Sequence, residues 1–133
     1  MGYSKPGHGK YRVQIPYHYS ATTKNLHVLE ISCVPLGMMV PPGAVVDPGE
    51  VILMLEPGDA LVLYSDGVTD MQNAAGDFYD EARLEGLIKA HVVSGAKALI
   101  DAVFQDLAQF KGSAPQTDDV TLLVLVRKVG ALM

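Results

Sequence analysis

Cysteine is nearly absent: Cys33 is the only one in 133 residues. A lone cysteine excludes an intrachain disulfide and a cysteine-rich zinc site, and we therefore expect a reducing compartment such as the cytoplasm. No basic segment leading into an apolar core opens the sequence, so no export signal is predicted. The longest mainly aliphatic run, Val120–Val126, is far too short to span a membrane.

Positive charge is also scarce. Ten Lys and Arg residues stand against 15 Asp and Glu, giving a net charge of −5, and the basic residues are scattered along the chain. This pattern argues against DNA or RNA as a partner, because phosphate backbones are bound by clustered basic residues. An apolar content of 49% with 19% charged residues is typical of a globular protein. The length suits one core, so residues 1–133 are predicted to form a single domain.

The first third of the sequence predicts strands and a loop. Residues 10–19 are rich in aromatic and β-branched types, which favours a strand, although Pro16 restricts it to a sheet edge or a bulge. Residues 25–31 alternate between apolar and polar types and predict a second strand. Residues 35–49 are rich in proline, which lacks the backbone donor for strand pairing, and predict a surface loop.

Residues 50–67, "EVILMLEPGDALVLYSDG", contain two apolar runs around the turn sequence Glu56-Pro57-Gly58-Asp59. Proline followed by glycine is typical of a type II turn, so this segment predicts a β-hairpin. Both arms are apolar at nearly every position, and residues 120–128 show the same pattern. Continuous apolar strands predict that both faces of the sheet are covered.

Two helices are predicted between these strands. Asp80 is the expected N-cap of the first helix, in which Leu84, Leu87, Ile88 and His91 recur at helical spacing. The second helix is expected to start after Ser94 and to end at Gly112. The predicted fold class is α+β, with antiparallel sheet layers and two antiparallel helices packed on one face.

Carboxylates flank two of the predicted strands. Asp66 follows the strand "ALVLY", with Gly67 beside it to allow close approach, and Asp118 and Asp119 directly precede the last strand. If these strands are antiparallel neighbours, the acids converge at one edge of the sheet. Carboxylate oxygens are the ligands that Mg²⁺ and Mn²⁺ prefer. The same residues are also common in turns and loops without any ligand, so spacing alone leaves both interpretations open.

The order of motifs resembles the SpoIIE-like (sporulation-phosphatase) branch of the metal-dependent protein phosphatase (PPM) family, from about residue 30 to 128. The matching motifs occur in the family's order and spacing. They are Pro35-Leu36-Gly37, Pro57-Gly58-Asp59, Ser65-Asp66-Gly67-Val68-Thr69-Asp70, Phe78 with Glu81 and Leu84, and Asp118-Asp119-Val120-Thr121. The resemblance implies that the chain is the C-terminal portion of such a domain, a partial α-β-β-α sandwich.

The resemblance also implies a chemistry. Asp66 and Asp118 would be ligands of a divalent metal centre, Mn²⁺ or Mg²⁺, with Asp119 and Gly67 in accessory positions. Thr69 and Asp70 would support the Asp66 loop through hydrogen bonds, although the sequence favours at least as strongly a strand-end threonine and a solvated turn acid with no such role. In this family two ions activate a water that attacks phosphoserine or phosphothreonine. The implied substrate is a phosphoprotein of a bacterial signalling switch, an anti-sigma-factor antagonist in the branch that the chain resembles.

One element of the family site is absent from the sequence. Residues 1–29 contain no aspartate, whereas the family takes a bridging carboxylate from an Asp-Gly step after an early strand. Pro6-Gly7-His8 matches either the family's Gly-His-Gly step or its later Ala-Gly-His step, and neither supplies the acid. With two carboxylates we expect at most one weakly bound ion and little or no phosphatase activity.

Two further expectations follow from the missing acid and the partial domain. The alternative to an enzyme is a non-catalytic module that keeps the phosphatase-like sheet and helices for interaction or dimerisation. Apolar strands with an uncovered face or edge favour self-association. We therefore expect a homodimer in which the sheets pair or swap between chains.

Overall fold

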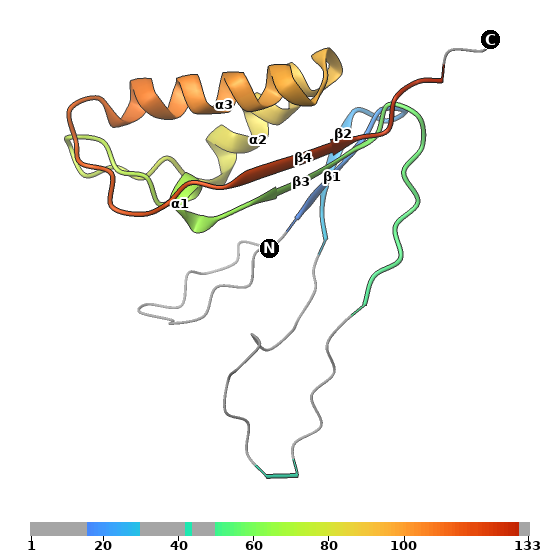
Figure 1. The fold of residues 1–133 in the computed structure, drawn as a ribbon, viewed down its shortest axis with the longest axis horizontal. Coiled ribbons are helices and arrows are strands. Elements are labelled where there is room, and N and C mark those ends of the chain that lie inside the picture. The colour runs from blue at the N-terminus through green and yellow to red at the C-terminus, as the bar shows by residue number, and fades with distance from the viewer. Residues whose placement is uncertain (1–15, 30–41, 44–49, 131–133) are drawn as a thin grey trace.

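The computed structural model describes residues 16–29, 42–43 and 50–130. Its elements follow one another along the chain and are drawn in Figure 1. They are β1 (Tyr17–Ser20), β2 (Asn25–Val28), β3 (Ala60–Tyr64), α1 (Asp66–Thr69), α2 (Glu81–His91), the 3-10 helix η1 (Val92–Ser94), α3 (Ala96–Lys111) and β4 (Leu122–Val126). None of the described helices has the length and apolar character needed to cross a membrane.

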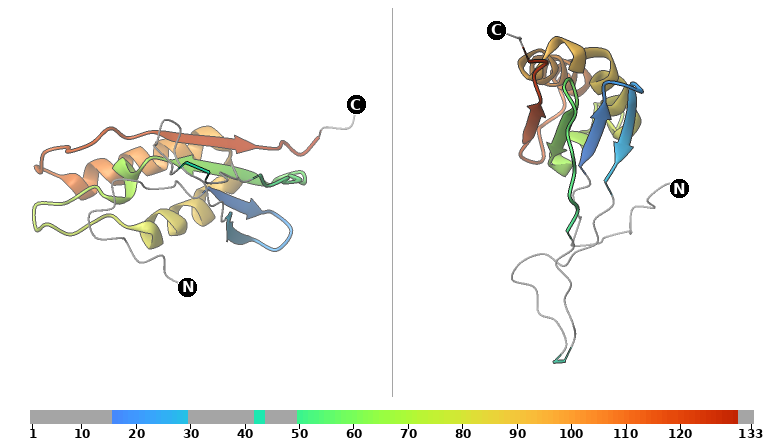
Figure 2. Two further views of the ribbon diagram at one scale, coloured as in Figure 1. Left: turned by 90° about the horizontal axis from the view of Figure 1, so that it is seen from below. Right: turned by 90° about the vertical axis from the view of Figure 1, so that its right-hand side faces the viewer.

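The four described strands form one antiparallel sheet in the order β2-β1-β3-β4. Helices α2 and α3 cover one face of this sheet, and the end-on view in Figure 2 shows both on the same side. The two helices run in opposite directions, because Arg83 in the first turn of α2 contacts Asp106 late in α3. The predicted α+β class, with two antiparallel helices on one face of an antiparallel sheet, is confirmed.

The helix boundaries agree with the sequence signals. Asp80 caps α2, since its carboxylate accepts a hydrogen bond from the Arg83 backbone N–H at 3.2 Å. Helix α3 ends before Gly112, which adopts a positive φ of 55°. Strand β2 covers residues 25–28 of the second predicted strand, whose residues 30–31 lie outside the described part of the chain. The same is true of residues 10–15 of the first predicted strand, of Pro6-Gly7-His8 and of Cys33. Of the predicted loop, residues 35–49, only 42–43 are described.

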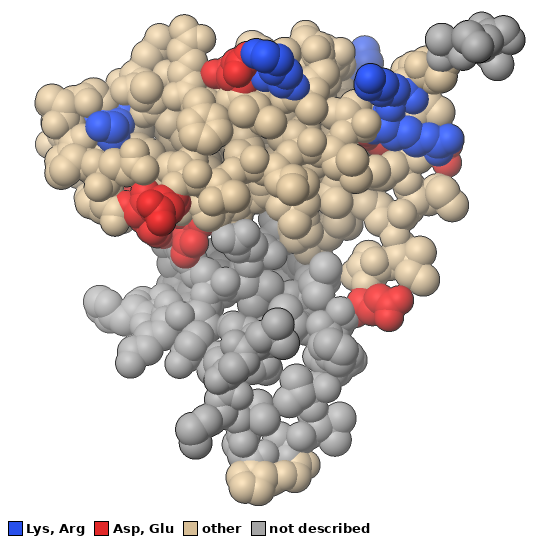
Figure 3. Space-filling view, in the orientation of Figure 1, with Lys and Arg blue, Asp and Glu red and all other residues tan. Residues whose placement is uncertain are grey.

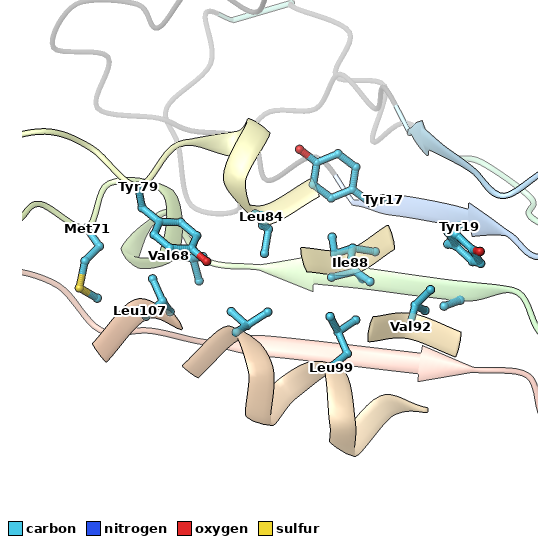
Figure 4. Packing of buried hydrophobic residues seen from close by; sticks show 13 residues of the cluster. Tyr17, Tyr19, Val68, Met71, Tyr79, Leu84, Ile88, Val92, Leu99 and Leu107 are labelled. Carbon is cyan, nitrogen blue, oxygen red and sulfur yellow. The ribbon is translucent and has the colours of Figure 1, made fainter. Parts of the chain in front are cut away.

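The core lies between the helices and the sheet (Figure 4). Apolar side chains recur every three or four residues along α2 and α3 and point towards the strands, whose inward residues are almost fully buried. The fully or nearly buried apolar residues of α2, α3, β1 and β3 are Leu84, Ile88, Leu99, Val103, Leu107, Tyr17, Tyr19, Ala60 and Val62. Burial of these side chains fixes which face of each strand turns inward.

The predicted hairpin is wrong in its pairing, although its turn is present. Gly58 has a φ of 89°, and the Asp59 N–H donates to the Glu56 carbonyl at 2.9 Å. However, residues 51–55 form no strand, and Ile52 is 90% exposed. Strand β3 pairs instead with β1 and β4. An apolar run specifies that a strand is buried but not which strand lies beside it, and here β1 and β4 occupy both edges of β3.

The second sheet face also departs from the prediction. We expected both faces of the apolar strands to be covered, but only the face under α2 and α3 is covered by described elements. On the other face Leu63, Leu123 and Leu125 are 37%, 55% and 52% exposed. Within the described residues, helices therefore cover one side of the sheet only, as the resemblance to a partial sandwich implies.

Candidate functional site

The end of β3 and the start of β4 lie side by side. Tyr64 is paired with Leu122 in the antiparallel register, so the residues that follow β3 meet those that precede β4. Ser65 joins the two segments: its N–H donates to the Thr121 carbonyl at 2.9 Å, and its Oγ accepts the Thr121 N–H at 2.9 Å. The strand arrangement on which convergence of the acids depended is therefore the one observed.

Gly67 brings the two segments into direct contact. A Cβ added at this position would lie 1.9 Å from the Asp119 carbonyl oxygen, far inside any permitted contact. The Ser65 hydroxyl reaches the same carbonyl at 3.2 Å. The glycine is needed here because its missing side chain is the space that the Asp119 backbone occupies. We call the contacts of Ser65 and Gly67 with Asp119 and Thr121 the β3–β4 seam.

Asp66 is the first residue of the short helix α1, where the sequence had suggested a turn. Its carbonyl accepts the Asp70 N–H at 2.8 Å, which closes the helical turn, and its side chain is half-buried. Thr69 is 1% exposed, and its carbonyl accepts the Asp80 N–H at 3.1 Å. These contacts hold Asp66 and Asp70 on a rigid turn between the end of β3 and the start of α2.

Asp118 and Asp119 are exposed residues of the loop before β4. The Asp118 carboxylate accepts the Asp119 N–H at 2.8 Å, and the Gln116 side chain donates to the Asp118 carbonyl at 2.9 Å. A small hollow separates this loop from the end of α1. Its lining residues are Gly67, Asp70, Met71, Gln72, Pro115, Gln116, Thr117 and Asp118. Asp70 and Asp118 therefore face a common space, and acidic side chains gather near α1 in Figure 3.

The described carboxylates near the β3–β4 seam are the type of ligand that a hard divalent cation prefers, but too few of them are grouped together. The acids around the β3–β4 seam carry carboxylate oxygens, which Mg²⁺ and Mn²⁺ prefer. Within residues 16–29, 42–43 and 50–130, however, no group of three or more His, Cys, Asp or Glu residues is arranged to hold a metal ion. The described residues thus contain acids of a suitable type near the seam but no cluster of three or more such ligands.

A network that sequence reasoning missed supports α1 from the helix side. Arg83 donates to both carboxylate oxygens of Asp106, at 2.8 and 3.0 Å, and the Tyr79 hydroxyl donates to Asp106 at 2.7 Å. Hydrogen bonds from Arg83 and then from Tyr79 hold the pKa of Asp106 below its usual range. The Tyr79 N–H in turn donates to the Met71 carbonyl at 2.8 Å, which connects the network to the segment after α1. No local motif signals these contacts, because the partners are 23 and 27 residues apart.

Asp59, at the other end of β3, is a buried carboxylate rather than a solvated turn residue. It is 3% exposed and accepts hydrogen bonds from the Ala21 N–H at 2.8 Å, the Glu56 N–H at 3.1 Å and His18 Nε2 at 3.0 Å. Burial alone would raise the pKa of Asp59, but these hydrogen bonds outweigh it and lower the pKa. Asp59 fastens the turn to β1 and has no place in the candidate site.

Solved structures share this arrangement of sheet and helices. The SiaA-PP2C domain of Pseudomonas aeruginosa superposes with a TM-score of 0.62 at 22% identity, covering 85% of this chain and 42% of that domain. The phosphatase domain of the cell-fate determinant SpoIIE from Bacillus subtilis gives a TM-score of 0.54 at 16% identity, again over 85% of this chain and over 46% of that structure. The fold is therefore part of a PP2C-type phosphatase fold.

Sequence comparison identifies the family. The family model described as Stage II sporulation protein E (SpoIIE) matches residues 12–128, and the chain belongs to this family. It is 39% identical over 75 residues to the phosphoserine phosphatase RsbU of Bacillus subtilis strain 168, and 31% identical over 75 residues to the protein IcfG of a Synechocystis species. These matches cover 56% of this chain but 22% and 12% of the two relatives.

Proposed function

We propose that this chain forms part of the catalytic domain of a metal-dependent protein serine/threonine phosphatase. The single observation that carries the proposal is the β3–β4 seam, which brings the segments bearing Asp66 and Asp118 together in a member of the SpoIIE family. The seam is made by backbone groups, one hydroxyl and a glycine. The seam therefore joins the two acid-bearing segments through groups other than the Asp66 and Asp118 carboxylates.

Asp66 and Asp118 are the proposed ligands of Mn²⁺ or Mg²⁺. Asp66 is held at the start of α1, and Asp118 is oriented through the Asp119 N–H. Asp70 and Asp118 line the hollow between α1 and the loop before β4, whereas Asp66 is not among its lining residues. Thr69 and Gly67, both buried, fix the backbone of α1. A divalent ion bound there would supply the charge that acidifies a water molecule and neutralises phosphoryl oxygens.

The proposed substrate is a phosphoserine or phosphothreonine residue of a phosphoprotein. The support is the 39% identity to a phosphoserine phosphatase, together with the resemblance to phosphatases of bacterial sigma-factor switches. An anti-sigma-factor antagonist in the cytoplasm is the specific substrate that we propose. The fold alone does not discriminate among phosphoproteins, because recognition resides in surfaces that vary between relatives.

A non-catalytic module is the competing function, and one observation favours it. The described residues lack a third acidic ligand beside Asp66 and Asp118, whereas a bridged pair of ions needs shared carboxylates. We accordingly expect this 133-residue chain to bind at most one ion weakly and to turn over phosphate esters poorly by itself. The two functions differ in whether the site takes up metal at all.

Calorimetric titration with Mn²⁺ separates the two functions. The wild-type chain should release or absorb heat on binding, and both Asp66→Asn and Asp118→Asn should abolish the signal. Asp101→Asn is the matched control, because Asp101 is an exposed acid of α3 whose carboxylate pairs with Lys97, away from the seam. A wild-type chain without a binding isotherm, or equal binding by all three variants, would refute the metal site and leave the interaction module.

A further inference from the structure

Strand β4 has a neighbour on one side only within the described sheet, as the end-on view in Figure 2 shows. The Thr121 carbonyl and both backbone groups of Arg127 bond towards β3 and the turn before it. Because these directions alternate along a strand, Leu122, Val124 and Val126 present their N–H and C=O groups to the open edge. Nothing within β4 guards this edge, since it contains no proline, glycine or charged residue.

We propose that two copies of this chain associate by antiparallel pairing of their β4 strands into a continuous eight-stranded sheet. Charge complementarity selects the second copy as the partner. Acids Asp118 and Asp119 precede β4, and bases Arg127 and Lys128 follow it, so the edge is complementary to itself when reversed. The proposal does not rest on phosphatase activity, but it uses the Asp118 carboxylate that is also a proposed metal ligand, so the cross-linking test below removes metal with EDTA.

The charges also select one register. With Leu123 opposite its own copy, Asp119 lies opposite Arg127 of the second copy, and Asp118 lies opposite Lys128. The outward backbone groups of Leu122 then meet those of Val124, as antiparallel pairing requires. Moving the centre to Val124 would place Arg127 opposite Thr121 and Lys128 opposite Val120, and both acid–base pairs would be lost.

Helix α3 offers an apolar contact on the same side of the molecule. Asp106 faces α2 through its pair with Arg83. Each helical residue turns by about 100°, so Phe104, two residues before Asp106, lies on nearly the opposite side of α3, roughly 160° away by the shorter way round. It therefore points away from α2, over the open edge of the sheet, and is 44% exposed. In the proposed dimer the two α3 helices lie side by side and Phe104 is covered, while Leu123 on the opposite sheet face meets its own copy.

Cysteine cross-linking tests both the interface and its register. Single cysteines are placed in a Cys33→Ser background, in EDTA so that metal binding plays no part. Leu123→Cys lies on the two-fold axis at a non-hydrogen-bonded pair, where Cα atoms are about 4.5 Å apart, within the range of a disulfide. We expect a cross-linked dimer under mild oxidation. Leu125→Cys is the matched control, because it faces the same side but lies opposite Thr121 of the second copy.

The second test measures the molar mass of the protein by light scattering, without cross-linking. The wild-type chain should have the mass of a dimer at micromolar concentration. Lys128→Glu should raise the dimer dissociation constant about tenfold, and Lys128→Glu combined with Asp118→Lys should restore it. Circular dichroism checks that each variant is folded. A monomeric wild-type chain, or cross-linking of Leu125→Cys as efficient as that of Leu123→Cys, would overturn the proposal.

Discussion

Gly67 lies directly against the backbone carbonyl of Asp119, at a separation that leaves no room for a side chain. This contact joins the turn that carries Asp66 to the loop that carries Asp118 and Asp119. The candidate site therefore depends on an absent Cβ as much as on the acids themselves, and the dependence can be measured.

Gly67→Ala should destabilise the protein. The new Cβ would stand 1.9 Å from a backbone oxygen, so the β3–β4 seam must open. We expect a loss of about 1–3 kcal/mol in the free energy of unfolding, measured by urea denaturation, and a loss of Mn²⁺ binding. Gly86→Ala is the matched control: no atom lies within 4 Å of its added Cβ, and alanine should stabilise α2 by about 0.5–1 kcal/mol. Equal stability of the two variants would contradict the seam.

Asp59→Asn should make the free energy of unfolding less dependent on pH in the acidic range. The folded-state pKa of Asp59 is lowered, so its contribution is present above the unfolded-state pKa of about 3.9 and is lost as the pH falls through the folded-state pKa. At pH near neutrality we expect the variant to lose about 1–3 kcal/mol, because the Ala21 and Glu56 N–H donors lose a charged acceptor.

Thermal melts at neutral pH and at a pH below the folded-state pKa check this expectation. The gap between wild type and Asp59→Asn should narrow in acid. Asp101→Asn, which removes an exposed helical pair with Lys97, should leave stability almost unchanged at either pH, because solvent screens the pair. A gap that stayed constant with pH would show that Asp59 acts through packing alone.

Asp106→Ala should destabilise the helix pair through Tyr79. The Tyr79 hydroxyl would lose its acceptor, and Arg83 would lose its carboxylate partner. We expect a loss of about 1–3 kcal/mol in the free energy of unfolding, since Tyr79 is 1% exposed and water cannot replace the bond freely. Adding Tyr79→Phe should cost less in the Asp106→Ala background than in the wild type, and strictly additive losses in this double-mutant cycle would disprove the coupling.

Phosphatase activity of the 133-residue chain should be low. With Mn²⁺ and a small aryl phosphate we expect turnover near the uncatalysed background, because the described residues provide too few ligands for a bridged pair of ions. Release of the coloured phenol measures it directly. Robust turnover that disappears in Asp66→Asn would show instead that these acids suffice for catalysis.

The two helices and the strands β3 and β4 were predictable because their signals are local, and the candidate acids were chosen from motifs that are equally local. Asp80 precedes a run of residues at helical spacing, Gly112 ends the second helix, and the motifs around Asp66 and Asp118 are continuous in sequence. Spacing within a helix or strand is fixed by the backbone geometry of that element alone. The prediction that the two acidic segments converge needed one further assumption, that β3 and β4 are neighbours, and the sheet satisfies it.

Tertiary structure alone decided which strand lies beside which and which face of the sheet the two helices cover. Residues 51–55 are as apolar as β4, yet β4 pairs with β3 and residues 51–55 do not. Likewise, no local sequence signal shows that the Asp59 carboxylate accepts a hydrogen bond from the Ala21 N–H, or that Asp106 accepts hydrogen bonds from both Arg83 and Tyr79. Strand pairing and buried polar contacts join residues far apart in the chain, so they are set by the competition among whole elements for a place in the core and not by the composition of any one of them.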